Sequence, residues 1–155
     1  MAALRDTGAL VGKDALVQST ELLEKVHQVY GVAASAIIGE YLTYHLLRMG
    51  ISAQQFSDMH RAVMNATSLK LGDVVIAVSS SGSTKDLLHA VQLGKEHGAS
   101  IIVLSNTRRS PLATLADQLL VAAGPLTAGS FHSKISAMLV IELLSQQLLE
   151  TRPEL

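Results

Sequence analysis

Two runs of consecutive apolar residues stand out in the middle of the chain. The segments 74–78 and 101–104 contain no polar residue and are rich in β-branched side chains. A strand with one solvent-exposed face would alternate apolar and polar positions, so unbroken runs indicate strands that are buried on both faces. The pattern therefore predicts two central strands of a parallel sheet.

Around these runs, apolar residues recur at steps of three and four, which is the spacing of an amphipathic helix. Gly50 and Gly98 follow two such segments and are expected to end them. Asp14 is expected to be the N-cap of the helix that comes first in the chain. Helix and strand signals alternate along the chain. We expect helices over 14–25, 33–49, 58–68, 84–97, 111–117 and 131–150, strands over 26–30, 51–57, 74–78, 101–104 and 118–121, and a short tail over 151–155.

This alternation predicts an α/β fold, with right-handed crossovers and a three-layer αβα sandwich around a five-stranded parallel sheet. A length of 155 residues suits one domain over 1–155, with a leading helix at 14–25 and an αβ core at 26–150. Only 3% of the residues are aromatic while 48% are hydrophobic, so the core must consist mainly of Ala, Val, Ile and Leu. That composition is typical of a parallel sheet covered by helices.

Ligands of such sheets bind at the carboxyl ends of the strands, so the loops after the strands are the candidate sites. The loop at 79–84, SSSGST, places five hydroxyl side chains around Gly82 at the start of a helix. Glycine permits a sharp turn, and the first turn of the helix offers free amide hydrogens and the positive end of its dipole. This arrangement predicts a phosphate site that needs no cation. The alternative is that Ser83 or Thr84 caps the helix and the other serines only make the loop polar.

A second loop, GVAAS at 31–35, has Gly31 for a turn and Ser35 at a helix start, where capping and ligand contact both fit. The later glycines of a dinucleotide-binding fingerprint are missing, and so is the GKS or GKT of a P-loop. We therefore expect no nucleotide cofactor, and no cofactor of another kind.

Charge and cysteine content narrow the function further. The net charge is −1, which leaves no basic excess for holding a nucleic-acid backbone, and the chain has no cysteine. We expect no metal site, no signal peptide, no membrane span and a cytoplasmic location. A mean hydropathy of +0.34 is high for a monomer, so a homodimer or higher oligomer is expected.

The region from Gly31 to Asp117 resembles the SIS (sugar isomerase) phosphosugar-binding domain. The resemblance rests on GVAAS, on the SxSGxT pattern of Ser79, Ser81, Gly82 and Thr84, and on the order of helices and strands. Within that family, GDVVIAVSSSGST followed by GASIIVLSNTRRSPLATLAD looks most like the effector domain of RpiR-type transcriptional regulators.

The resemblance implies a flavodoxin-like strand order 2-1-3-4-5, a dimer packed through helices, and a sugar phosphate as ligand. It places the ligand's phosphate on Ser35, Ser79, Ser80, Ser81 and Thr84, and Gly82 and Ser83 complete the binding loop. Where the family usually has a second glycine, GxGxS, this chain has Ala33, which could tighten the pocket.

The alternative function is a stand-alone sugar-phosphate isomerase, which needs a base near the bound sugar. The candidate bases near the carboxyl edge of the predicted sheet are Glu40, Asp58, His60, Asp86 and His132. If the protein is an isomerase, we expect Glu40, His60 and His132 to be its catalytic residues. Asp58 and Asp86 also fit a helix cap and a first helical turn, and Glu40, more than a turn into its helix, also fits a position that faces solvent or a subunit partner. No motif typical of the isomerases is evident, so we expect binding without turnover.

About 25 residues precede the first predicted strand, which is too few for a DNA-binding domain. Either the chain is an effector domain of a longer regulator, whose separate domain would contact DNA, or it is a complete SIS protein. We favour the effector domain.

Overall fold

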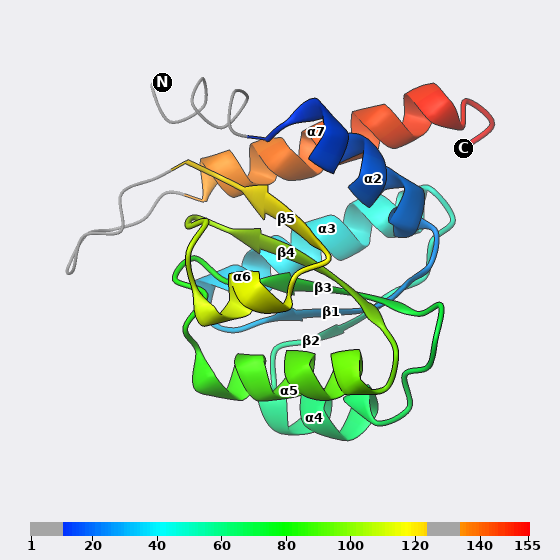
Figure 1. Cartoon of the computed structure of the whole chain (residues 1–155). Helices are drawn as coiled ribbons and strands as arrows, with labels where there is room; N and C mark the ends of the chain where they lie inside the picture. Colours follow the sequence, from blue (N-terminus) through cyan, green and yellow to red (C-terminus); the bar gives the residue numbers. More distant parts are fainter. Residues whose placement is uncertain (1–10, 124–133) are drawn as a thin grey trace.

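A parallel five-stranded sheet forms the centre of the computed structural model, which describes residues 11–123 and 134–155 (Figure 1). The strand order is β2-β1-β3-β4-β5. This is the expected order 2-1-3-4-5, and every neighbouring pair runs parallel. The strands are β1 (Val26–Gly31), β2 (Gln54–Phe56), β3 (Val74–Val78), β4 (Ser100–Ser105) and β5 (Gln118–Val121).

Helices cover both faces of the sheet, which confirms the three-layer arrangement. In Figure 1, α2 and α7 lie above the sheet, and α4 and α5 lie below it. Helix α3 contributes to the same core cluster as α2 and α7. The short helix α6 packs in the same layer as α4 and α5. The helices are α2 (Lys13–Leu23), α3 (Ala34–Arg48), α4 (Met59–Ala66), α5 (Lys85–Glu96), α6 (Pro111–Leu115) and α7 (Ile135–Thr151). None of these described helices is long and apolar enough to cross a membrane.

The hydrophobic core is divided by the sheet into two clusters. Successive residues of β3 alternate between them: Val74 and Ile76 contact the side of α2, α3 and α7, whereas Val75 and Ala77 contact the side of α4, α5 and α6. All five residues of this strand are buried. Burial on both faces is the reason that the strand sequence contains no polar position.

Most predicted boundaries are correct to within a few residues, and those of β3 and β5 match fully. The strand predicted over 51–57 is too long, because only Gln54–Phe56 pairs with β1 at the sheet edge. The first helix begins at Lys13 with Gly12 as its N-cap, so Asp14 lies in the first turn and the predicted cap is wrong. The first part of the final helix predicted over 131–150 lies outside the described residues.

Candidate functional site

The serine loop, residues 79–84, connects the carboxyl end of β3 to the start of α5. The buried hydroxyl of Ser79 accepts a hydrogen bond from the amide of Gly82 at 3.0 Å, and the hydroxyl of Ser81 accepts one from the amide of Ser83 at 3.2 Å. These bonds fold the loop back on itself. Ser81 and Thr84 remain exposed at its surface.

Capping of α5 does not explain the hydroxyl groups of the loop. Thr84 is the N-cap residue by position, but its side chain makes no capping hydrogen bond. The Ser83 hydroxyl donates to the carbonyl of Ser81 at 3.4 Å rather than capping the helix. The amides of the first turn of α5 are therefore left to bind water or an anion.

Position 82 requires a glycine for two reasons, its backbone conformation and the close approach of Ser110. Its φ is +67°, and a Cβ added there would lie 2.2 Å from the hydroxyl oxygen of Ser110. The carbonyl of Gly82 also accepts a hydrogen bond from the amide of Leu112 at 3.0 Å. The serine loop thus packs directly against the start of α6.

The loop from β4 to α6, residues 105–110, is bonded to the serine loop. The Ser105 hydroxyl and the backbone amide of Asn106 both donate to the carbonyl of Ser80, each at 3.2 Å. Ser110 caps α6 by accepting from the amide of Ala113 at 3.0 Å. Asp117 accepts from the amide of Ile101 at 2.7 Å and so ties β5 to the beginning of β4. These bonds give a structural reason for the SPLA and AD segments of the sequence.

Lys134 is a candidate site residue that the sequence did not reveal. It lies at the start of α7, and its ammonium group donates to the hydroxyl of Ser80. Partial burial lowers the pKa of the Lys134 amino group. The loop pattern predicts a phosphate site that needs no cation, whereas the structure brings this lysine against the serine loop. No local pattern could have shown this, because 54 positions separate the two residues.

The first loop begins beside the serine loop, because Gly31 pairs with Val78 in the sheet. A Cβ on Gly31 would lie 2.6 Å from the carbonyl oxygen of Ser35, so this glycine permits the close turn into α3. Ala33 is the N-cap of α3 and has φ +55° and ψ −125°. Ser35 is buried within the first turn, and its alternative role as the cap is wrong. Whether it contacts ligand stays a prediction.

The comparison with protein families decides the classification. A model described as the SIS domain matches residues 24–146, most of the chain. The chain belongs to the SIS domain family.

Relatives of this SIS domain include longer transcriptional regulators. An HTH-type transcriptional regulator of Caldanaerobacter subterraneus is 33% identical over 147 residues, which cover 92% of this chain and 52% of that protein. The HTH-type transcriptional regulator RpiR of Escherichia coli K12 is 34% identical over 121 residues, which cover 77% of this chain and 41% of RpiR. The chain thus spans about half the length of these relatives.

Solved structures agree with the fold. NanR of Vibrio vulnificus, complexed with ManNAc-6P, is 41% identical with a TM-score of 0.91, and the match covers 99% of this chain and 60% of NanR. The sugar isomerase domain of the RpiR transcription factor from Sphaerobacter thermophilus is 24% identical with a TM-score of 0.91, over 99% of this chain and 87% of that one. At 24% identity, the similarity to the second structure indicates only that the fold is shared.

In the part of the chain that the structure describes, no hydrogen bond or ion pair connects a candidate catalytic residue to the serine loop. Glu40 is exposed on α3. His60 is exposed on α4 and lines a groove of about 490 Å³ with Asp58, Asp86 and His89. Asp58 caps α4, accepting from the amide of His60 at 2.9 Å, as predicted. Asp86 lies in the first turn of α5, also as predicted. His132 lies outside the described residues.

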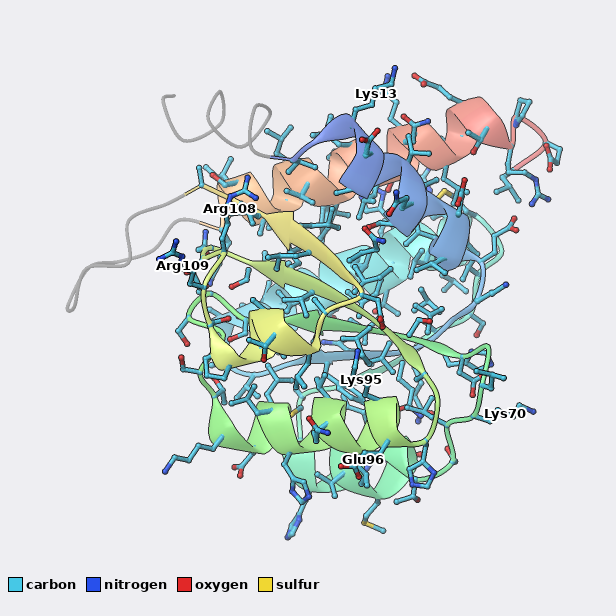
Figure 2. The ribbon with its side chains drawn as sticks, in the orientation of Figure 1. Lys13, Lys70, Lys95, Glu96, Arg108 and Arg109 are labelled. Carbon is cyan, nitrogen blue, oxygen red and sulfur yellow. The ribbon has the colours of Figure 1, made fainter. Side chains whose placement is uncertain are left out.

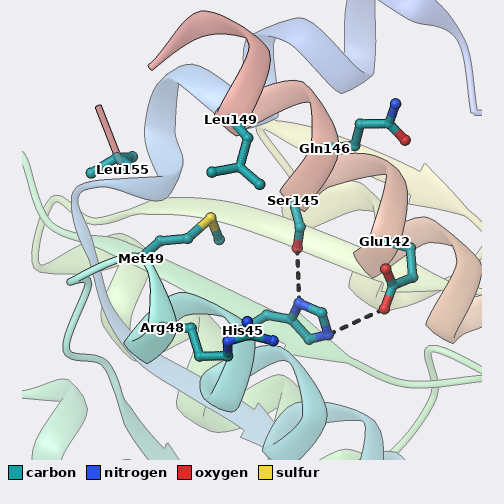
Figure 3. Close-up of a pocket in the computed structure, with 8 residues that line it drawn as sticks. All are labelled: His45, Arg48, Met49, Glu142, Ser145, Gln146, Leu149 and Leu155. Atoms are coloured by element: carbon teal, nitrogen blue, oxygen red, sulfur yellow. Dashed lines mark hydrogen bonds and ion pairs between the residues drawn. The ribbon is translucent and has the colours of Figure 1, made fainter. Parts of the chain in front are cut away.

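A second groove of the SIS domain lies between α3 and α7 (Figure 3). There the Nε2 atom of His45 lies 3.2 Å from a carboxylate oxygen of Glu142, and its Nδ1 atom lies 3.4 Å from the hydroxyl oxygen of Ser145. The order of serine, histidine and carboxylate suggests a catalytic triad, but the Ser145 hydroxyl donates to the carbonyl of Ile141 at 2.9 Å and its residue is buried. The cluster therefore joins two helices and presents no activated nucleophile. Within residues 11–123 and 134–155, no group of three or more acidic, histidine or cysteine side chains could hold a metal ion.

Proposed function

We propose that this SIS domain binds a sugar phosphate at the serine loop and serves as the effector domain of a cytoplasmic transcriptional regulator of carbohydrate metabolism. Its phosphate site would consist of Ser35, Ser79, Ser80, Ser81, Gly82, Ser83 and Thr84, together with Lys134. The observation that carries the proposal is the position of Lys134 against Ser80, beside a helix start whose side chains leave its amides uncapped. A cation, free amides and hydroxyls together fit a phosphate dianion.

The relatives support a sensing role. NanR, which shares 41% of its aligned residues with this chain, is complexed with ManNAc-6P in its solved structure. The curated relatives are HTH-type regulators, so DNA contact is assigned to a separate HTH domain of a longer protein. ManNAc-6P is accordingly the first ligand to test.

We further propose that the chain forms a homodimer through α3 and α7. Large apolar side chains on these two helices, Ile37, Tyr44, Leu47 and Ile135, are between 57% and 63% exposed. The two helices are neighbours, joined by the His45–Glu142 pair. Large exposed apolar side chains on neighbouring helices are typical of an interface.

An effector must couple its ligand to a change elsewhere, and α7 offers a direct connection. The residue at its start, Lys134, contacts the serine loop, while Glu142 and Ser145 further along contact α3 at the proposed dimer face. A ligand that engages Lys134 would favour one position of α7 over another. Differential affinity for two such arrangements is what allosteric control requires.

Turnover by an isomerase is the alternative, and the structure gives it no specific support. Glu40 and His60 are exposed on different helices, and neither is bonded to the serine loop among the described contacts. Incubation with a bound sugar phosphate in deuterated water, followed by NMR, tests this point. Exchange of deuterium at C1 or C2 of the sugar would contradict the sensing role.

Isothermal titration calorimetry with ManNAc-6P and with unphosphorylated ManNAc tests the proposal. We expect binding only of the phosphorylated sugar, and at about 100 times its dissociation constant it should raise the free energy of unfolding by about 2.7 kcal/mol. Ser81→Ala should weaken binding by about tenfold, because an exposed hydroxyl facing a phosphate donates a charge-assisted hydrogen bond.

The matched control is Ser52→Ala, because Ser52 is an exposed serine that precedes β2 at the opposite edge of the sheet. It should bind like the unmodified protein. Equal affinity for both sugars, or unchanged affinity for ManNAc-6P in a folded Ser81→Ala variant, would contradict the phosphate site.

A further inference from the structure

Two adjacent arginines, Arg108 and Arg109, occupy the middle of the loop between β4 and α6. Both side chains are exposed. Figure 2 shows them at the end of the molecule where β4 and β5 finish. The protein has a net charge of −1, so two neighbouring cations at this edge are a local concentration of positive charge.

This loop is held in place on both sides of the arginines. Before them, Ser105 and Asn106 donate to the carbonyl of Ser80. After them, Ser110 packs against Gly82, and the amide of Leu112 donates to the Gly82 carbonyl. Both ends of the arginine segment are therefore fixed to the loop that would bind phosphate.

The backbone between these anchors is also ordered by its own hydrogen bonds. The Thr107 hydroxyl accepts from the amide of Arg109 at 3.2 Å and donates to the Arg109 carbonyl at 3.1 Å. The Thr107 amide in turn donates to the hydroxyl of Ser105 at 3.4 Å. These hydrogen bonds preorganise the backbone that carries the two arginines.

The two arginines add positive charge to an edge that already offers a cation and a helix start to one phosphate. Lys134 and the start of α5 already face the proposed phosphate position. The guanidinium of Arg109 forms no ion pair with any carboxylate among the described residues. Guanidinium groups bind carboxylates and phosphates in a bidentate manner, whereas sugar hydroxyls do not need a full positive charge.

We propose that Arg108 and Arg109 bind a second anionic group of the ligand, so that the preferred ligands are sugar phosphates carrying a carboxylate or a second phosphate. This inference rests on the proposed function, because it takes the serine loop as the site of the first phosphate. It names these two arginines as determinants of ligand class.

Calorimetry with matched pairs of sugars tests the inference. One pair is glucose 6-phosphate and 6-phosphogluconate, which adds a carboxylate, and the other is fructose 6-phosphate and fructose 1,6-bisphosphate, which adds a phosphate. At least one doubly anionic sugar should bind about tenfold more tightly than its singly anionic partner, as expected for a charge-assisted pair. The pair that responds identifies the second anion.

The double variant Arg108→Gln/Arg109→Gln should abolish this preference while changing the affinity for the singly anionic sugars by less than about twofold. The control is Lys25→Gln/Lys70→Gln, which removes two exposed charges at the amino edge of the sheet and should keep the preference. If the double variant fails to fold, Arg109→Gln alone provides the test and should reduce the preference.

The outcomes separate the two proposals. Similar affinity for singly and doubly anionic sugars would overturn the arginine inference and leave the proposed function intact. An equal loss of affinity for all sugars in the arginine variant would also overturn it, because that result indicates general electrostatic attraction only. Absence of binding by every sugar phosphate, ManNAc-6P included, would overturn the proposed function and the inference with it.

Discussion

Two loops lie next to each other at the carboxyl edge of the sheet, residues 31–35 at the end of β1 and residues 79–84 after β3. Both loops need a residue with positive φ, but they place different residue types there. Each contains a position with positive φ, +55° at Ala33 and +67° at Gly82. Gly82 is buried beneath Ser110, so a side chain has no room there. Ala33 is exposed, so its methyl group fits although its backbone conformation is unfavourable.

The difference shows which part of the site is fixed by packing. The serine loop depends on contact with the β4–α6 loop, and glycine is needed for that contact. The first loop has only a local backbone cost, of about 1–3 kcal/mol for a residue other than glycine in such a region. The family resemblance agrees, since a second glycine is usual where this chain has Ala33.

The largest effect is expected for Gly82→Ala. The new methyl group would approach the Cβ of Ser110 at 2.6 Å as well as its hydroxyl, and the positive φ adds strain. We expect a loss of about 3 kcal/mol in the free energy of unfolding, measured by urea denaturation, and loss of sugar-phosphate binding.

A double-mutant cycle with Ser110→Gly separates the two causes. Removing both clashing atoms should restore part of the stability lost in Gly82→Ala, and the remaining loss measures the backbone strain. Equal losses from Gly82→Ala in the presence and absence of Ser110 would contradict the packing explanation.

A smaller effect of opposite sign is expected for Ala33→Gly. Glycine relieves the unfavourable φ but gives the unfolded chain more freedom, so the net result should be a gain of about 1 kcal/mol in the free energy of unfolding. Chemical denaturation measures it, with Ala34→Gly as the control, because Ala34 begins α3 with ordinary helical geometry and should lose stability. A loss of stability in Ala33→Gly would show that the alanine side chain makes a contact that outweighs the strain.

The fold and the serine loop could be predicted from the sequence because their signals are local. The unbroken apolar run of β3 and the glycine among hydroxyl residues lie within a dozen positions of one another. The overlong prediction for β2 has a physical cause, since an edge strand pairs on one side only and its ends are set by β1 rather than by its own sequence. Lys134 could not be found in this way, because its contact with Ser80 depends on how α7 packs across the sheet. The packing of Ser110 on Gly82 is equally non-local.

The most direct test of the central claim is the position of the bound phosphate. Amide chemical shifts measured by NMR during titration with ManNAc-6P should change most at residues 81–85, with little change at Ser52. Titration with unphosphorylated ManNAc should leave the same amides unchanged. Shifts concentrated instead in the groove between α3 and α7, around His45 and Leu149, would contradict a phosphate site at the serine loop.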